Sequence, residues 1–155
     1  TNPAGANVQL TGVFDRDLTV TMAEVLVRMG MKRTLVVWGE GNLDEMTITG
    51  TTHVAEGRDG VVKSYTVTPE ELGLKRATLD QIRGGATADE AALQVREVLG
   101  GTAGPKLDMV LLNGGGALLA AGKVNDLREG VERARRIIES GAALEKLEQL
   151  VAFCQ

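Results

Sequence analysis

Apolar and polar positions alternate over residues 8–14, and this alternation predicts a β-strand. Over residues 18–29 the apolar positions instead recur at spacings of three and four, which is typical of an amphipathic helix, and Gly30 follows as its C-terminal cap. The apolar run at residues 34–38 predicts a second strand. A strand, a helix and a strand in such close succession indicate a βαβ unit, so we expect the two strands to be parallel.

Three short runs rich in β-branched residues come next, at residues 46–49, 52–56 and 61–67. The pair Asp59-Gly60 separates the last two runs and is a strong signal for a tight hairpin turn. We therefore expect residues 52–67 to form an antiparallel β-ribbon.

The rest of the chain has mainly helical patterns. Thr68-Pro69-Glu70-Glu71 combines an N-cap, a proline at the first helical position and acidic residues in the first turn, so it predicts a short helix that Gly73 ends. Residues 74–85 are expected to be irregular. Four longer helices are predicted over residues 88–99, 105–121, 126–139 and 143–153.

The helix predicted at 105–121 is apolar nearly all round, so we expect it to be buried. Gly114-Gly115-Gly116 lies in its middle. A phosphate cradle needs free N–H groups at a strand-to-helix turn, so these glycines are interpreted as permitting close packing. Together the patterns predict an α/β fold with a mixed sheet, made of a βαβ unit and an antiparallel ribbon, with helices packed around it.

Length and composition limit the possible functions. The chain has 155 residues, which suits one domain, and a net charge of −4, which argues against nucleic acid or an anionic membrane as a partner. Cys154 is the single cysteine, and no apolar run reaches membrane-spanning length, so a cytoplasmic protein is expected. The chain opens on Thr1 without a methionine, and we expect it to be cut from a longer chain.

The candidate site is the polar turn Gly39-Glu40-Gly41-Asn42-Leu43-Asp44-Glu45, which follows the apolar strand at 34–38. Ligands of α/β proteins bind at the carboxyl ends of strands. Two adjacent carboxylates, those of Asp44 and Glu45, suit a hard cation such as Mg²⁺, which prefers a few carboxylate oxygens together with phosphates and water. The alternative is a solvated acidic loop, which is common on protein surfaces.

Short motifs along nearly the whole chain resemble, in order, those of the anthranilate phosphoribosyltransferases of tryptophan biosynthesis. The matching segments are Asn2-Pro3-Ala4, Met22-Ala23-Glu24-Val25-Leu26, Val36-Val37 with Gly39 and Leu43-Asp44-Glu45, Thr68-Pro69-Glu70-Glu71-Leu72-Gly73-Leu74, Leu111-Leu112-Asn113 with Ala117-Leu118, and Ser140-Gly141 with Ala143-Leu144-Glu145-Lys146-Leu147. Each segment is weak alone, but the ordered set is specific.

The resemblance implies an enzyme that joins anthranilate to the ribose of phosphoribosyl pyrophosphate (PRPP) and releases pyrophosphate, with Mg²⁺ on the phosphates. Asp44 and Glu45 match the family's acidic metal-binding pair. Asn2 and Pro3 are candidate substrate-binding residues at the domain hinge and the entrance to the anthranilate site, and the alternative is an ordinary exposed turn. The implied fold is that of the nucleoside phosphorylases and phosphoribosyltransferases that carry a helical N-terminal domain.

Residues 1–155 match only the C-terminal α/β domain of that two-domain fold. The family's Gly-rich pyrophosphate loop, its Lys-His-Gly-Asn segment and its anthranilate-binding arginine precede the Asn-Pro-Ala segment, so no catalytic residue is identified here. We expect this segment to be inactive alone, and the full-length enzyme to be a homodimer that forms through its helical domain.

Two departures from the family pattern concern the strand and the turn. Asn42 replaces a usual glycine, and Asn tolerates a positive φ, so the turn can persist. Trp38 replaces a common histidine, which leaves His53 as the single histidine, interpreted as structural or exposed. The alternatives are a same-fold relative, such as a pyrimidine-nucleoside phosphorylase or a non-catalytic paralogue, and a stand-alone binding module.

Overall fold

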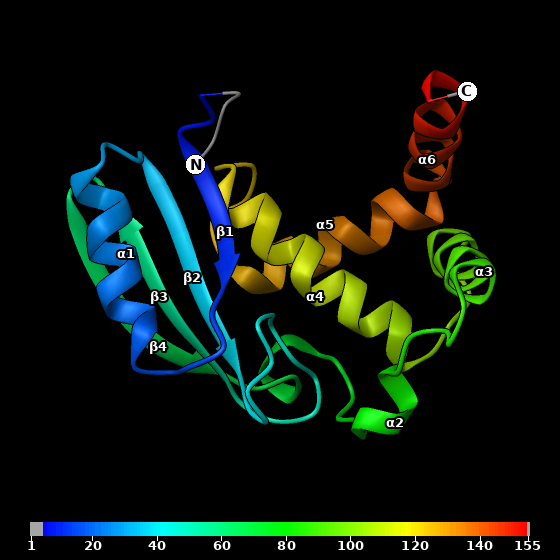
Figure 1. The fold of residues 1–155 in the computed structure, drawn as a ribbon, viewed down its shortest axis with the longest axis horizontal. Coiled ribbons are helices and arrows are strands. Elements are labelled where there is room, and N and C mark those ends of the chain that lie inside the picture. Colours follow the sequence, from blue (N-terminus) through cyan, green and yellow to red (C-terminus); the bar gives the residue numbers. More distant parts are fainter. Residues whose placement is uncertain (1–4, 155) are drawn as a thin grey trace.

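The computed structural model describes residues 5–154 and contains one four-stranded sheet in the order β1-β2-β3-β4 (Figure 1). Its strands are Val8–Gly12 (β1), Arg33–Gly39 (β2), Thr52–Arg58 (β3) and Val61–Val67 (β4). β1 pairs with β2 in parallel, while β2, β3 and β4 pair antiparallel. The predicted βαβ unit and β-ribbon are therefore confirmed.

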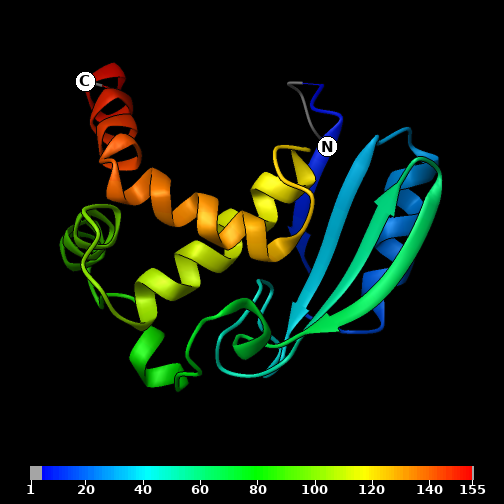
Figure 2. The same ribbon diagram turned by 180° about the vertical axis from the view of Figure 1, so that it is seen from behind.

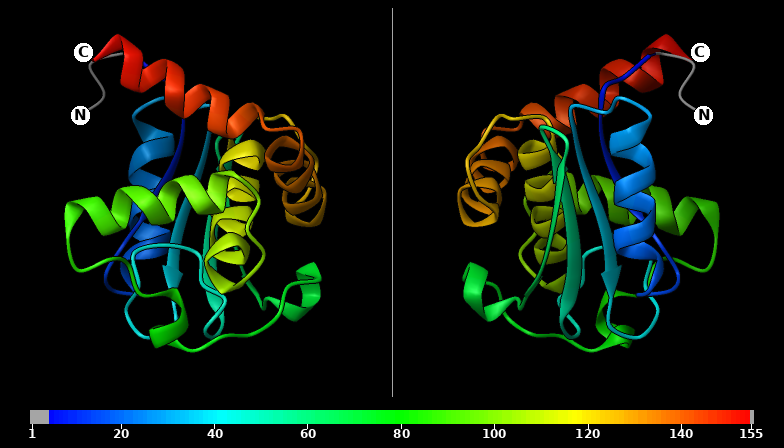
Figure 3. Two further views of the ribbon diagram at one scale, coloured as in Figure 1. Left: turned by 90° about the vertical axis from the view of Figure 1, so that its right-hand side faces the viewer. Right: turned by 90° about the vertical axis from the view of Figure 1, so that its left-hand side faces the viewer.

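Helices cover both faces of this sheet, as Figures 1 and 3 show. On one face, helix α1 (Leu18–Arg28) buries Ala23 in a small cluster with Val36 and Ala55. The main core lies on the other face, where helix α4 (Pro105–Ala120) packs against β1 and β2. β2 is buried along nearly its whole length because its side chains pack on both faces, in keeping with its apolar sequence.

The other helical elements extend from the core. They are the 3₁₀-helix η1 (Glu70–Leu72), α2 (Leu79–Ile82), α3 (Ala88–Leu99), α5 (Leu127–Glu139) and α6 (Ala142–Phe153). Figure 2 shows α2, α3 and α6 on the side of α4 and α5 away from the sheet. The prediction for 74–85 was wrong over residues 79–82, because Thr78 and Gln81 form a reciprocal capping box that starts α2.

The β-branched run at 46–49 is an irregular buried segment, not a strand. Met46, Thr47 and Ile48 are all almost completely buried, so no side of the segment faces solvent. Side chains satisfy its backbone in place of a neighbouring strand: the Thr47 N–H donates to Thr52 Oγ1 at 2.9 Å, and the Met46 N–H donates to Asn113 Oδ1 at 3.0 Å.

The glycine run in α4 permits close packing, as the sequence predicts. A Cβ placed on Gly115 would lie 2.8 Å from the backbone nitrogen of Val131, and one on Gly130 would lie 2.6 Å from the Gly115 carbonyl oxygen. Helices α4 and α5 therefore cross with their backbones in contact. Nothing about this crossing resembles a phosphate cradle, because Gly114-Gly115-Gly116 lies inside the helix.

Within residues 5–154, no helix is long and apolar enough to cross a membrane. The predicted hinge residues Asn2 and Pro3 lie outside the described residues. Cys154, at the end of the described range, is an exposed free thiol.

Candidate metal-binding turn

The acidic turn lies where β2 ends, in the loop that returns the chain to β3 (Figure 1). Two backbone hydrogen bonds close it: the Gly39 N–H donates to the Leu43 carbonyl at 2.8 Å, and the Leu43 N–H donates to the Gly39 carbonyl at 3.0 Å. Gly41 and Asn42 both take a positive φ, of 91° and 63°. Asn42 thus serves where a glycine is usual, as predicted from its tolerance of this conformation.

The backbone around Asp44 and Glu45 lies directly against glycines at the ends of both parallel strands. A Cβ on Gly12, the last residue of β1, would lie 1.5 Å from the carbonyl oxygen of Asp44. A Cβ on Gly39, the last residue of β2, would lie 2.7 Å from the carbonyl oxygen of Glu45. The backbone of the acidic pair therefore packs directly on the two strand ends. A residue larger than glycine at position 12 or 39 would clash with it.

A third contact comes from Asn113 in the middle of α4. Its Oδ1 accepts from the Met46 N–H at 3.0 Å, and its Nδ2 donates to the Met46 carbonyl at 2.9 Å. The same Nδ2 also donates to the carbonyl of Met109, one turn earlier in the helix, at 3.1 Å. The amide of Asn113 thus pairs with the residue that follows Glu45 much as a neighbouring strand would.

Glu40 ties the two ends of the loop together. Its N–H donates to the Thr51 carbonyl at 2.9 Å, and its carboxylate Oε2 accepts from the Thr51 N–H at 2.8 Å. Glu40 is exposed, yet its carboxylate is bonded to the loop backbone. Of the turn's three acidic residues, only Asp44 and Glu45 have no hydrogen bond to their carboxylates within the part of the chain that the structure describes.

Both of these carboxylates are exposed. Partial burial of the Glu45 carboxyl raises its pKa, and the neighbouring charge of Asp44 raises that pKa further. Two carboxylates that repel each other in this way bind a divalent cation favourably, because the cation relieves the repulsion.

The donor set fits Mg²⁺ as one side of an open site. Among residues 5–154, no group of three or more His, Cys, Asp or Glu side chains is arranged to hold a metal ion. Two carboxylate oxygens leave most positions of an octahedral ion to water and phosphate oxygens, which is the arrangement that Mg²⁺ takes at substrate phosphates. The turn is therefore suited to an ion that arrives with an anionic substrate.

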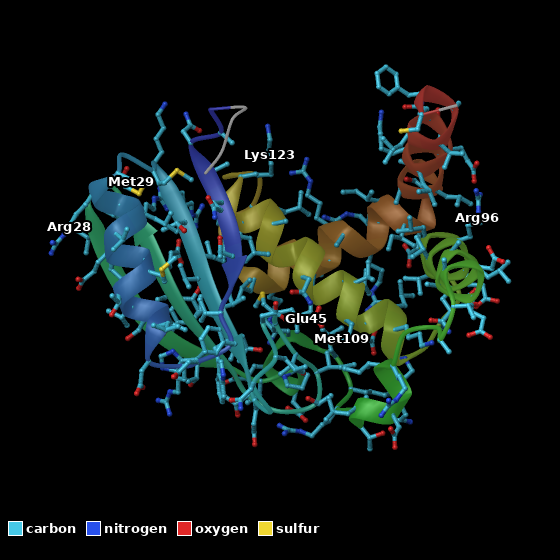
Figure 4. All side chains as sticks on the ribbon, in the orientation of Figure 1. Arg28, Met29, Glu45, Arg96, Met109 and Lys123 are labelled. Carbon is cyan, nitrogen blue, oxygen red and sulfur yellow. The ribbon has the colours of Figure 1, made fainter. Side chains whose placement is uncertain are left out.

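A cavity of about 280 Å³ opens beside Glu45. Helices α3 and α4 supply most of its wall, including the apolar side chains of Val95, Val98 and Met109, and Lys106 is a cationic wall residue. Figure 4 shows Glu45 near Met109, where the loop after β2 meets α4. Glu45 thus borders a largely apolar cavity whose wall carries one positive charge, that of Lys106.

His53 pairs with Trp38 across β2 and β3. Its Nδ1 lies 3.5 Å from the Thr19 hydroxyl, and burial, with the nearby charge of Arg16, lowers its pKa. The lowered pKa favours the neutral imidazole, and its contact with Thr19 of α1 is in keeping with its interpretation as structural. The Trp38 indole N–H is buried and has no hydrogen-bond partner among the described residues.

Comparison with known proteins shows the family to which this chain belongs. Residues 1–144 match the glycosyl transferase family, a/b domain. The chain belongs to this family. It is 63% identical to the anthranilate phosphoribosyltransferase of Desulfotalea psychrophila over 153 residues, which are 99% of this chain and 44% of that protein. The chain therefore spans a little under half the length of the curated relatives it matches.

Solved structures agree with this assignment. The anthranilate phosphoribosyltransferase of Thermus thermophilus is 46% identical and superposes with a TM-score of 0.87 over 99% of this chain and 45% of that chain. The enzyme of Saccharomyces cerevisiae, solved in complex with PRPP and Mg, is 28% identical, with a TM-score of 0.78 over 91% of this chain and 41% of that chain. The predicted family and the predicted α/β fold are confirmed.

Three contributors to the turn were not predicted as such from the sequence: Gly12, Glu40 and Asn113. Gly12 occupies the end of a strand, where glycine can mark a close backbone approach. Asn113 is a polar side chain inside an otherwise apolar helix segment. The sequence therefore marks Gly12 and Asn113 as unusual, but it does not show which segment each of them contacts.

Proposed function

We propose that this chain is the C-terminal α/β portion of an anthranilate phosphoribosyltransferase, which transfers the phosphoribosyl group of PRPP to anthranilate in tryptophan biosynthesis. The observation that carries the proposal is the pair of unpartnered carboxylates, Asp44 and Glu45, seated at the carboxyl ends of β1 and β2 in the described part of the chain. Support also comes from a 63% identical relative that bears this name. None of the three relatives described above is named for a phosphorylase.

In this proposal, Asp44 and Glu45 hold Mg²⁺ on one side while the pyrophosphate of PRPP holds it on the other. The bound ion supplies charge neutralisation for the pyrophosphate leaving group. The S. cerevisiae relative, solved with PRPP and Mg, supports the choice of ion. The protein's own contribution is to keep both carboxylates at a fixed place and free of competing hydrogen bonds.

The rest of the site comes from the portion of the protein that this chain does not include. Among residues 5–154, the turn provides no group of three metal-binding side chains. We propose that the intact enzyme is a cytoplasmic homodimer, and that residues 1–155 alone do not turn over PRPP. The PRPP-binding and anthranilate-binding groups that complete the site belong to the N-terminal half.

Complementation tests this proposal. Purified residues 1–155 are expected to give no anthranilate-dependent release of pyrophosphate, and addition of the separately expressed N-terminal half restores it. The double variant Asp44→Asn with Glu45→Gln abolishes the restored activity, while Asp59→Asn, at the hairpin between β3 and β4, leaves it unchanged. Turnover by residues 1–155 alone, or full activity of the double variant, would refute the proposal.

A further inference from the structure

Both peptide groups that flank Glu45 are held in place by residues distant in the sequence. The peptide that precedes Glu45 carries the Asp44 carbonyl, which lies against Gly12. The peptide that follows carries the Glu45 carbonyl, which lies against Gly39, and the Met46 N–H, which donates to Asn113 at 3.0 Å. Because the two peptide planes are fixed, the direction of the bond from Cα to Cβ in Glu45 is fixed too.

The contact from Asn113 differs from the other two because it is directional. The glycines constrain the turn only by close packing, whereas Asn113 forms directional bonds: its Oδ1 accepts from the Met46 N–H, in the peptide group after Glu45, and its Nδ2 donates to the Met46 carbonyl, in the next peptide group. The bond from its Nδ2 to the Met109 carbonyl keeps the amide in one orientation. The Asn113 side chain is therefore bonded to its own helix as well as to the turn.

The helix gains little from an asparagine at this position. Asparagine is a poor helix former, since its side chain competes for backbone hydrogen bonds. The surrounding α4 residues Leu111 and Leu112 are buried and apolar. An asparagine here is accounted for by its partner, the backbone next to Glu45.

We propose that Asn113 is a positioning residue for the metal: it holds the backbone after Glu45 so that the Asp44 and Glu45 carboxylates are preorganised for a divalent cation. This inference rests on the proposed function, in which those two carboxylates bind Mg²⁺. Residues that orient metal ligands typically contribute about 10–100-fold to metal affinity, and preorganisation of this kind requires rigid support.

Mn²⁺ binding to the intact enzyme tests the proposal without reliance on turnover. Electron paramagnetic resonance measures free Mn²⁺ during titration in the presence of inorganic pyrophosphate. Asn113→Leu keeps the approximate size of the side chain but removes both polar groups, and Asn113→Ala removes the side chain beyond Cβ. We expect each variant to weaken Mn²⁺ binding by about 10-fold or more.

Two sets of controls separate the possible outcomes. Val131→Ala removes buried apolar contacts from α5, next to α4 and away from the turn, and reports the effect of lost stability alone. It is expected to lower the melting temperature and to leave Mn²⁺ affinity at the wild-type value. Asp44→Asn reports whether the acidic pair binds the ion at all.

Weaker Mn²⁺ binding in every Asn113 variant that folds, with wild-type affinity in Val131→Ala, supports the positioning role. Wild-type affinity in a folded Asn113 variant, when Asp44→Asn weakens binding, overturns this inference alone. Wild-type affinity in Asp44→Asn overturns the proposed metal site and this inference with it. If Val131→Ala weakens binding as much as the Asn113 variants, the effect is one of stability and the inference is also wrong.

Discussion

The contact between Gly12 and Asp44 makes the sharpest prediction about the turn. In Gly12→Ala, the new Cβ would lie 1.5 Å from the Asp44 carbonyl oxygen, where real Cβ atoms keep at least 3.0 Å from other heavy atoms. The obstacle is backbone, so the turn itself must move, by about 1.5 Å. A misplacement of about 1 Å near a reacting centre costs on the order of 100-fold in rate.

We therefore expect Gly12→Ala in the intact enzyme to reduce phosphoribosyl transfer by about 100-fold or more, and to raise the Mg²⁺ concentration needed for half-maximal rate. Overpacking of this kind also costs roughly 1–3 kcal/mol of stability. The assay is the initial rate of anthranilate consumption as Mg²⁺ is titrated, with a thermal melt of each variant.

The matched control is Gly114→Ala in α4, where the new Cβ would lie 3.6 Å from the Cβ of Ala134, an ordinary contact. This variant should keep its activity and gain up to about 1 kcal/mol of stability from better helix propensity. A Gly12→Ala enzyme with wild-type rate and wild-type Mg²⁺ dependence would refute the reasoning, since it would mean that the turn tolerates displacement.

Four further predictions concern the buried residues and the acidic pair. Thr34→Val removes a buried hydroxyl that has no hydrogen-bond partner among the described residues, and should stabilise the protein by about 1 kcal/mol in chemical denaturation, whereas a loss of stability would contradict this. Gly130→Ala places a Cβ 2.6 Å from the Gly115 carbonyl oxygen and should cost roughly 1–3 kcal/mol in the same assay, so an unchanged midpoint would show that the helices can separate freely. The raised pKa of Glu45 means that the folded state favours the protonated carboxyl more than the unfolded state does. The ionised carboxylate therefore lowers the free energy of unfolding as the pH rises through that pKa. Glu45→Gln should then be stabilising at neutral pH. Asp44→Asn removes one cause of the shift and should lower the pKa of Glu45 in a carboxyl NMR titration, where an unchanged pKa would contradict the assigned cause.

Much of the fold could be predicted because its signals are local. The spacing of apolar residues located α1, the buried run located β2, and Asp59-Gly60 located the hairpin between β3 and β4. The β-branched run at residues 46–49 forms no strand, and this has a physical cause. β-branched residues favour a strand only where another strand supplies hydrogen bonds, and here Asn113 and Thr52 supply them instead.

The candidate site could be predicted only in part. Asp44 and Glu45 were found because they follow a buried strand and match a family motif. The residues that hold them were not, because Gly12 and Asn113 reach the turn through contacts between segments far apart in the sequence. The periodicity of apolar residues locates helices and strands, but it does not show which distant segment a side chain such as that of Asn113 will contact.

The most direct test of the account is a crystal structure of the intact enzyme soaked with PRPP and Mn²⁺, with the metal located by its anomalous scattering. The account predicts an anomalous peak within bonding distance of carboxylate oxygens of both Asp44 and Glu45, shared with pyrophosphate oxygens of PRPP. A bound Mn²⁺–PRPP complex whose metal contacts neither carboxylate would contradict it.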